Sequence, residues 1–436
     1  MEMSRREFMT SVAAGAAGMA AMGGTAFGQT AGASKDEIVV AMIGSGVQGR
    51  VLLNDCINIP GVRFKAICDI WPFAQRYAGN TLRRAGQQVE IYEDYREMLE
   101  KEKDLNAVIV ASPDFVHAEH TIACLQAGLH VYCEKEMADS LESARTMVLA
   151  ARESGRLCQI GHQRRSNPVY QQALQMVQKD EICGRVTACY GQWNRSVQPR
   201  LTWPERFVIP DETLQRFGFD SMDHFRNWRW FRRYSSGPIA DLGSHQISVF
   251  SWFLGANPTM LTAMGGSDYF PDREWYEDVM AMYEYQTAKG SARMFYQVIN
   301  TNGFGNYFER FKGDKGTLVI SESLQQSYYV PEGDYEIPDW LAQVERTQRG
   351  GMSVIPLGAA IAARNAEGAA VMQAIDQKTI HQRHLENFFE AVRANNPAHL
   401  TCPPDLAYSM AVPVLNVIKA VGSNEKLQFT EADYKI

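Results

Sequence analysis

An apolar run that leads directly into three spaced glycines is the feature that most constrains this fold. Residues 39–43 have the length and composition of a buried strand. Gly44, Gly46 and Gly49 follow in the pattern Gly-x-Gly-x-x-Gly, and a helical segment begins near Arg50. In such a turn the first glycine allows a tight reversal, the second lets the backbone approach a diphosphate, and the third lets helix and strand pack closely. Free N–H groups at the helix N-terminus attract the anion, so the turn predicts a dinucleotide-binding site.

An acidic residue stands where this fingerprint requires one. Asp69 follows the next apolar run, residues 64–68, about 20 residues beyond the glycines. A carboxylate here accepts hydrogen bonds from a ribose diol and repels a 2′-phosphate, which favours NAD over NADP. In the alternative interpretation, Arg76 folds over Asp69 and neutralises it, which would admit NADP. Val47 and Gln48, at the start of the helix, complete the predicted cofactor loop.

Apolar strands alternate with helical segments from residue 38 to residue 161. This alternation is typical of an α/β domain built on a doubly wound, right-handed parallel sheet, and we assign residues 34–163 to such a Rossmann domain. The expected strands are 39–43, 64–68, 90–92, 107–111, 130–133 and 157–161. The expected helices are 50–58, 73–84, 95–100, 117–127 and 141–153.

The pattern changes beyond this point. Several later runs alternate apolar and polar residues with period two, which predicts a second α/β domain at 164–436 with one open, mostly antiparallel sheet. We expect this domain to carry the substrate site and the contacts of a homo-oligomer. Its expected strands are 185–193, 279–285, 292–299, 305–311 and 316–320, and its expected helices are 168–179, 381–394 and 406–421. Glycine and proline interrupt residues 324–363, which we interpret as a long loop or insertion.

The N-terminus has the composition of a targeting segment. Arg5 and Arg6 precede a weakly apolar stretch, residues 12–27, that consists mostly of alanine, glycine and methionine. This arrangement resembles a twin-arginine export signal, so we leave residues 1–33 out of the fold and expect a periplasmic or otherwise exported protein. We expect no stable membrane insertion once the signal is removed. The alternative is a disordered tail whose paired arginines occur by chance.

Composition excludes several classes of function. The 436 residues carry a formal net charge of −7, which argues against a nucleic-acid-binding surface. No His-Glu-x-x-His or closely paired cysteine motif occurs, so no metal site is predicted. The eight cysteines include five in or beside apolar runs, which indicates buried free thiols rather than disulfides. Those five are Cys68, Cys124, Cys133, Cys158 and Cys189.

Three motifs together carry a family resemblance. The glycine loop is followed by Val-Ile-Val-Ala-Ser-Pro-Asp-Phe-Val-His at 108–117, Gly-Leu-His-Val-Tyr-Cys-Glu-Lys at 128–135 and Ser-Gly-Pro-Ile-Ala-Asp-Leu-Gly-Ser-His at 236–245. In this order they resemble the glucose-fructose oxidoreductase and inositol dehydrogenase family, known as Gfo/Idh/MocA, over nearly the whole chain. The resemblance implies a Rossmann domain, a C-terminal open-sheet domain, a nicotinamide cofactor at the strand ends and a sugar-like substrate above the nicotinamide.

The resemblance also suggests which residues act. It places the family's Glu-Lys pair on Glu134 and Lys135, and its Asp-x-Gly-x-His motif on Asp241 and His245. Oxidation of a secondary alcohol needs a base for the hydroxyl proton, which suits His245, and a cation beside the oxygen, which suits Lys135. If their segment is helical, Asp241 and His245 project from one face. Otherwise His245 is merely satisfied by Asp241, and Lys135 is a solvated loop charge. Further cofactor contacts are expected from Ser112, Pro113 and His117.

One residue departs from the family pattern. Glu136 follows Lys135 where the family commonly has proline. Proline makes a cis peptide bond inexpensive and glutamate does not, so the sequence leaves the backbone path at Lys135 open. Glu136 is expected to pair with Arg164 or Arg165, to contact substrate, or to face solvent.

Residues 193–234 interleave tryptophan with arginine. Aromatic faces stack on sugar rings and arginines donate forked hydrogen bonds, so a substrate-binding loop is one interpretation and an oligomer interface is the other. The tryptophans are Trp193, Trp203, Trp228 and Trp230, and the arginines are Arg195, Arg200, Arg206, Arg226, Arg229, Arg232 and Arg233. The predicted substrate contacts are Trp193, Arg229 and Trp230 from this region, with His162, Arg164 and Arg165 from the end of the last Rossmann strand.

Three functions are consistent with these features. The first is an exported, nicotinamide-dependent oxidoreductase that acts on a secondary alcohol of a sugar. The second is a glycosidase that oxidises a ring carbon, eliminates the aglycone and reduces the sugar again. The third is a non-catalytic sugar-binding protein, which the presence of both Lys135 and His245 disfavours. Free nicotinamide cofactor is expected to be scarce outside the cytoplasm, so export favours a tightly held cofactor and redox-neutral turnover.

Overall fold

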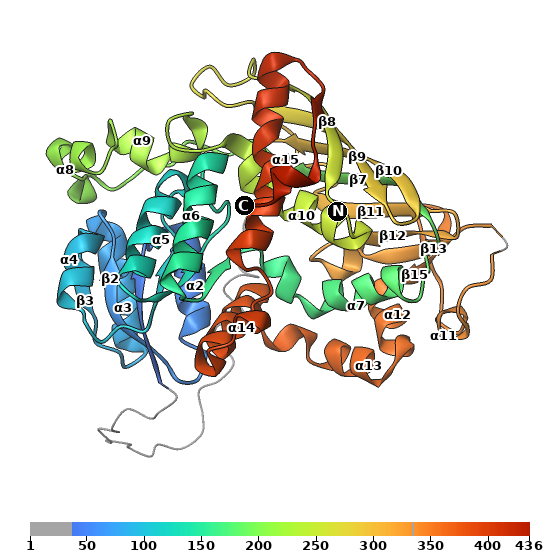
Figure 1. Cartoon of the computed structure of the whole chain (residues 1–436), viewed down its shortest axis with the longest axis horizontal. Coiled ribbons are helices and arrows are strands. Elements are labelled where there is room, and N and C mark those ends of the chain that lie inside the picture. Colours follow the sequence, from blue (N-terminus) through green and yellow to red (C-terminus); the bar gives the residue numbers. More distant parts are fainter. Residues whose placement is uncertain (1–36, 334) are drawn as a thin grey trace. The chain divides into compact units, whose positions relative to one another are not determined.

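A six-stranded parallel sheet forms the first half of the molecule (Figure 1). The computed structural model describes residues 37–333 and 335–436, so the twin-arginine motif lies outside the described residues. The strand order β3-β2-β1-β4-β5-β6 confirms the predicted Rossmann sheet. The strands are β1 (Ile38–Ile43), β2 (Val62–Cys68), β3 (Glu90–Tyr92), β4 (Ala107–Val110), β5 (His130–Cys133) and β6 (Cys158–Ile160).

Both faces of this sheet are buried, which explains why its strands are continuous apolar runs. In β1, Val39 and Ala41 belong to one core cluster, whereas Val40 and Met42 belong to the cluster on the opposite face. Helices cover both faces. They are α2 (Val47–Cys56), α3 (Pro72–Arg84), α4 (Tyr95–Lys101), α5 (His117–Gln126) and α6 (Leu141–Ser154).

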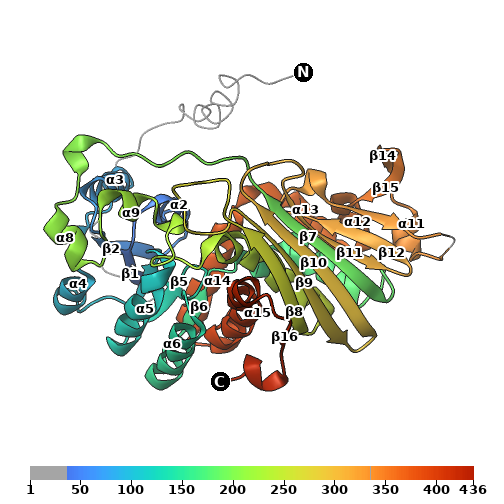
Figure 2. The same ribbon diagram turned by 90° about the horizontal axis from the view of Figure 1, so that it is seen from above.

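A ten-stranded sheet forms the second half (Figure 2). Its order is β14-β15-β13-β12-β11-β7-β10-β9-β8-β16, and its pairs are antiparallel except β7 with β10. This confirms the predicted open sheet. The strands are β7 (Val186–Asn194), β8 (Pro258–Gly266), β9 (Asp278–Thr287), β10 (Gly290–Ile299), β11 (Tyr307–Gly313), β12 (Gly316–Ile320), β13 (Tyr328–Pro331), β14 (Thr347–Arg349), β15 (Met352–Pro356) and β16 (Leu427–Gln428).

Helices of this half pack on one face of the sheet and against the first domain. α10 and α15 contact the sheet, and α14 contacts α2 of the Rossmann domain. Leu385 and Phe388 of α14 belong to the apolar cluster under β1, so the chain returns to the first domain near its end. The helices are α7 (Pro168–Gln178), α8 (Asp211–Arg216), α9 (Met222–Arg226), α10 (Ser244–Leu254), α11 (Asp339–Ala342), α12 (Leu357–Arg364), α13 (Ala366–Gln373), α14 (Ile380–Ala394) and α15 (Pro404–Ser423).

Two expectations for this half were wrong. Residues 324–363 are not a long loop, because they contain β13, β14, β15, α11 and most of α12. Their glycines and prolines mark the ends of short elements that are ordered by pairing of β13 with β12, a contact that local composition does not reveal. The strand β8 was missed because only Pro258 and Leu261 of its nine residues are buried, which leaves no alternating pattern.

The helix α15 is apolar because it is a core helix. By length and composition alone it could cross a membrane, and it is the one such helix among the described residues. More than half of its most apolar stretch is buried within the protein, where it contacts β8, α6 and α10. Its hydropathy is therefore accounted for by packing. All eight cysteines are buried and free, as predicted.

Candidate active site

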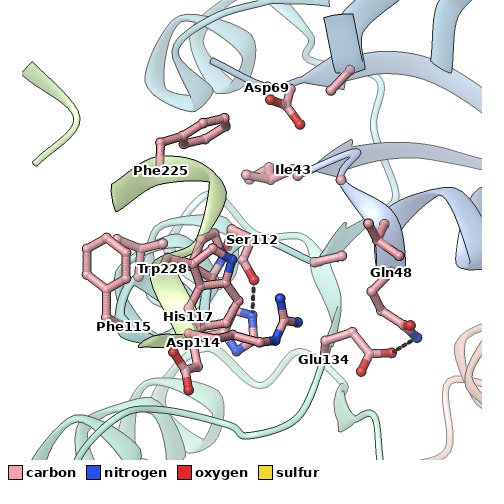
Figure 3. Close-up of a pocket in the computed structure, with 18 of the residues that line it drawn as sticks. Ile43, Gln48, Asp69, Ser112, Asp114, Phe115, His117, Glu134, Phe225 and Trp228 are labelled. Atoms are coloured by element: carbon pink, nitrogen blue, oxygen red, sulfur yellow. Dashed lines mark hydrogen bonds between the residues drawn. The ribbon is translucent and has the colours of Figure 1, made fainter. Parts of the chain in front are cut away.

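A cavity of about 840 Å³ is lined by residues from both domains. Its size lies within the range of ligand pockets. Figure 3 shows part of its wall, with Gln48, Asp69, Ser112, His117 and Glu134 directed toward one space. From the first domain the wall includes Gly44, Gly46, Val47, Gln48, Asp69, Ser112, Pro113, His117, Glu134, Lys135 and Glu136. From the second it includes Trp193, Arg195, Arg229, Trp230, Asp241 and His245.

The glycine loop has the geometry that a diphosphate requires. Gly44 has a φ of +87°, and an added Cβ would lie 2.5 Å from the Ser112 nitrogen. A Cβ on Gly49 would lie 2.2 Å from the Gly44 carbonyl oxygen, so helix and strand are in close contact. A Cβ on Gly46 would meet no described atom within 4 Å. No described side chain caps α2, whose first N–H groups are therefore available to an anion. The residues present thus fit a dinucleotide.

Asp69 is held firmly at the end of β2. One carboxylate oxygen accepts hydrogen bonds from the Ser45 N–H at 2.7 Å and the Ser45 hydroxyl at 3.1 Å, and the other accepts from the Trp71 N–H at 2.8 Å. Burial raises the pKa of Asp69, and these hydrogen bonds and the charge of Arg50 oppose the rise. Arg76 is exposed on α3 and makes no contact with Asp69 in the described structure, so the proposed neutralisation by Arg76 is not observed.

His117 joins two segments of the cofactor cleft. Its Nδ1 lies 2.8 Å from the Glu136 carbonyl oxygen, and its Nε2 lies 2.7 Å from the Ser112 carbonyl oxygen. Burial lowers the pKa of His117 to about 4, so the ring is neutral and donates to one carbonyl at a time. Across the cleft, the Gln48 amide donates to Glu134 at 3.2 Å (Figure 3). These contacts hold the loops after β4 and β5 in register with the glycine loop.

Lys135 and Asp241 form the centre of the reactive end. The Lys135 ammonium donates to the Asp241 carbonyl oxygen and lies 3.4 Å from its carboxylate. Arg229 approaches the same carboxylate oxygen at 3.3 Å. Burial alone would raise the pKa of Asp241, but the charges of Arg229, Lys135 and Arg195 outweigh it and hold this pKa well below its usual range. Asp241 is therefore an anion that fixes two cations at the cavity wall. The Lys135–Glu136 peptide bond is cis.

His245 faces the same space from the start of α10. Its ring is buried, its centroid lies 5.7 Å from that of Trp193, and its Nδ1 has no hydrogen-bond partner among the described residues. Burial, with the charges of Lys135 and Arg164, lowers the pKa of His245 well below its usual value, so the ring is neutral. No hydrogen bond or ion pair joins Asp241 to this ring in the described structure. Asp241 lies in a π-helical turn, Ile239–Gly243, which leads directly into α10 at Ser244.

The pairing expected for Glu136 was wrong. Arg164 instead makes a buried ion pair with Glu309 and a second one with Glu322 at 2.8 Å. Arg165 lies over the Trp252 ring at 4.9 Å.

The carboxyl of Glu136 is buried at the cavity wall. It accepts one hydrogen bond from the Met137 N–H at 3.0 Å, while its Oε2 has no partner within residues 37–333 and 335–436. Burial raises the pKa of Glu136 to about 7.

Three predicted substrate contacts lie outside the cavity wall. His162, Arg164 and Arg165 are absent from its lining, and Arg164 is paired through Nη1 and Nε with its two carboxylate partners. The His162 ring is buried 6.5 Å from that of His245, and neither of its nitrogens has a partner in the described part of the chain. The other three, Trp193, Arg229 and Trp230, do line the cavity. The structure therefore brings together Lys135, Asp241, His245, Trp193, Arg229 and Trp230.

Many of the interleaved arginines stack on aromatic rings of this chain. Arg229 lies 4.2 Å from the Trp228 centroid, and Arg226 lies 4.2 Å from that of Trp71. Arg226 belongs to the substrate loop expected from the sequence, whereas Phe225 and Asp114 were not expected at the site; all three line the cavity. A local signal existed in the density of aromatic residues at 203–234, but their target, the Rossmann domain, is remote in sequence.

The comparisons with known proteins agree with this geometry. Residues 38–162 match the model described as oxidoreductase family, NAD-binding Rossmann fold. Residues 212–400 match the companion model, oxidoreductase family, C-terminal alpha/beta domain. The chain belongs to the Gfo/Idh/MocA oxidoreductase family. Its first domain is accordingly an NAD-binding Rossmann domain.

Individual relatives are similar over different lengths. An uncharacterized oxidoreductase, YrbE of Bacillus subtilis, is 31% identical over 70% of this chain and 79% of its own length. Inositol 2-dehydrogenase of Rubrobacter xylanophilus is 31% identical over 41% of this chain. The matched region spans 50% of the length of that relative. The solved WlbA dehydrogenase of Chromobacterium violaceum, in complex with NADH and UDP-GlcNAcA, has a TM-score of 0.66 at 16% identity and covers 91% of this chain and 97% of its own. The last similarity concerns the fold.

Proposed function

We propose that this protein is an exported, NAD-dependent oxidoreductase that acts on a secondary alcohol of a sugar or sugar derivative. One observation carries the proposal: a lysine ammonium and a neutral histidine face the same cavity that begins at the dinucleotide loop. Lys135 comes from the end of β5 and His245 from α10, so each domain contributes one of the two groups.

The residues divide the work of alcohol oxidation. NAD bound at the glycine loop would supply the hydride acceptor for the carbinol carbon. The Lys135 ammonium donates a hydrogen bond to the substrate oxygen and stabilises its developing negative charge. Neutral His245 accepts the hydroxyl proton, a role that a protonated ring could not perform. The Asp241 carboxylate, shared with Arg229, holds Lys135 in position.

A sugar is the substrate class that the cavity wall favours. Trp193 and Trp230 place aromatic side chains at the cavity wall, and Arg195 and Arg229 supply donors for hydroxyl or carboxylate groups. The name of one relative, inositol 2-dehydrogenase, specifies a polyol substrate and supports the same class.

The export signal supports a retained cofactor. A twin-arginine route moves folded proteins, so NAD can bind before transit, and net redox-neutral turnover follows if the cofactor is never exchanged.

The second candidate is a glycosidase that oxidises, eliminates and reduces again. The buried Glu136 carboxyl favours it, because an acid with a pKa near 7 at the cavity wall can protonate a leaving group.

We also propose that the protein forms a homo-oligomer through the outer face of the ten-stranded sheet. Met264 and Met282 are large apolar residues on this face, with exposed fractions of 66% and 53%.

The first prediction concerns bound cofactor and products. Protein purified without added NAD should contain about one nicotinamide per chain, measured by absorbance after denaturation, and should turn over without added NAD. A screen of free sugars and aryl glycosides then separates the candidates, because an oxidoreductase yields a keto sugar or lactone and the glycosidase releases the aglycone. Cofactor-free protein that works only with millimolar NAD and releases NADH would contradict the proposal of retention.

A further inference from the structure

A segment of the second domain crosses to the cofactor cleft of the first. Residues 195–235, called here the covering segment, leave β7 and include α8 and α9, which lie beside the Rossmann domain in both views (Figures 1 and 2). Its apolar side chains form one cluster with those of the first domain. The buried members are Trp71 and Ala74 of the first domain with Ile209, Leu214, Phe219, Met222, Phe231 and Tyr234 of the covering segment.

The covering segment is anchored on both sides of the cleft. After β2, the Trp71 indole donates to the Phe207 carbonyl oxygen at 2.8 Å. After β4, the Phe115 ring meets Phe219 edge-on with centroids 5.6 Å apart. Beyond β3, Glu93 forms an ion pair with Arg216 of α8. These anchors follow the carboxyl ends of three different strands of the sheet. The segment therefore spans the strand ends at which a dinucleotide binds.

Two consecutive residues of α9 face the adenosine end of the cavity. Figure 3 shows Phe225 next to the strand ends that carry Ile43 and Asp69, and both Phe225 and Arg226 line the cavity. The Arg226 guanidinium lies 4.2 Å from the Trp71 centroid, and its buried Nε has no hydrogen-bond partner in the described ranges. A planar cation with a free donor and an aromatic ring are groups that stack on a purine and bind its ribose.

We propose that the covering segment clamps the adenosine half of NAD, with Phe225 and Arg226 as its contacts. The inference rests on the proposed function only in its consequence, which is that the cofactor is retained from one turnover to the next. The cluster that anchors the clamp is packed like a domain core, with Ile209 and Leu214 both 0% exposed. Release of the dinucleotide therefore requires part of this cluster to separate, which makes dissociation slow.

The experiment measures the dissociation rate of NADH from the full-length protein. NADH is loaded and then displaced by excess NAD, and the decay of its fluorescence is followed in the parent, Phe225→Leu, Arg226→Ala and Arg226→Lys. Phe225→Leu keeps an apolar side chain in the cluster, and Arg226→Lys keeps the charge but removes the planar group. Arg233→Ala is the matched control, because Arg233 is on the same segment, pairs with exposed Asp220 and lies outside the cavity.

We expect NADH to dissociate from Phe225→Leu and Arg226→Ala roughly ten- to a hundredfold faster than from the parent. The rate for Arg226→Lys should lie between those of the parent and Arg226→Ala, and the rate for Arg233→Ala should equal that of the parent. Unchanged melting temperatures without cofactor establish that the variants remain folded. Dissociation at the parental rate in both Phe225→Leu and Arg226→Ala would overturn the clamp. A parent that exchanges NADH within seconds would instead refute retention as a function, while a faster rate in the variants would still support the clamp.

Discussion

The charges around Asp241 organise the reactive end of the cavity at the scale of single residues. Its carboxylate forms ion pairs with both Lys135 and Arg229, and its backbone carbonyl oxygen also accepts a hydrogen bond from Lys135. His245 is left without a partner at Nδ1 within the described chain, and it is kept neutral by burial. The lysine is thus fixed as a donor and the histidine remains available as a base, which is the division of roles that alcohol oxidation needs.

Replacing the base tests this division. His245→Ala should lower kcat roughly 10²- to 10⁴-fold, because proton removal by a positioned base contributes about that much, while the Kd for NADH should not change. Steady-state rates and NADH titration measure the two effects. The exposed His399 lies outside the cavity, so His399→Ala should behave like the parent. Parental activity in His245→Ala would remove this residue from the mechanism.

At the scale of elements, the loop from β1 to α2 uses its glycines for different purposes. A Cβ on Gly49 would collide with the Gly44 carbonyl oxygen at 2.2 Å, and both atoms at this contact belong to the backbone or are fixed to it. A Cβ on Gly46 would project into open space within the cavity wall, and its φ of −66° suits any residue. One glycine therefore serves the fold and the other serves the ligand.

These two glycines form a matched pair for mutation. Gly49→Ala should destabilise the protein by about 1–3 kcal/mol, because the added methyl group overpacks a rigid contact. Gly46→Ala should leave the free energy of unfolding nearly unchanged and weaken NADH binding, because the methyl group occupies the space of the diphosphate. Denaturant unfolding and NADH titration separate the two results. Equal stability of both variants would contradict the assignment.

At the scale of the whole molecule, buried carboxyls make stability depend on pH. Burial raises the pKa of Glu136 to about 7 and that of Asp114 to about 8. Each carboxyl binds its proton more tightly in the folded than in the unfolded protein. Its contribution to stability is therefore complete below the unfolded pKa and is lost as pH rises through the folded pKa. Buried histidines with a lowered pKa, such as His117, make the free energy of unfolding depend on pH only below about 6.5. They therefore do not offset this loss at higher pH.

The free energy of unfolding should accordingly fall by about 1–2 kcal/mol between pH ~6.5 and ~8. Urea unfolding at several pH values in this window measures the slope. Glu136→Gln and Asp114→Asn together should make it shallower, because neither amide titrates, and Glu309, whose pKa burial also raises to about 7, should retain part of it. An equally steep slope in the double variant would assign the loss to other groups.

Local spacing was enough to predict the first domain. Alternating apolar runs, the three glycines and Asp69 act over a few residues each, and the resulting sheet order and loop geometry agree with the prediction. The positions of Lys135 and His245 on one cavity were predicted through the family resemblance of their motifs. These features depend on backbone conformation and on strand ends, both of which are encoded close together along the chain.

Tertiary structure alone decided the partners of buried charges and the destination of the covering segment. Arg164 pairs with Glu309, 145 positions away, so neither Arg164 nor Glu136 pairs as the sequence suggested. The aromatic residues of the covering segment are visible in the sequence, but their packing on Trp71 and Phe115 is not. A buried cation is stabilised by whichever carboxylate the fold brings close to it, and contacts between apolar groups have no directional preference. Such partners become known only when distant segments of the chain are brought together.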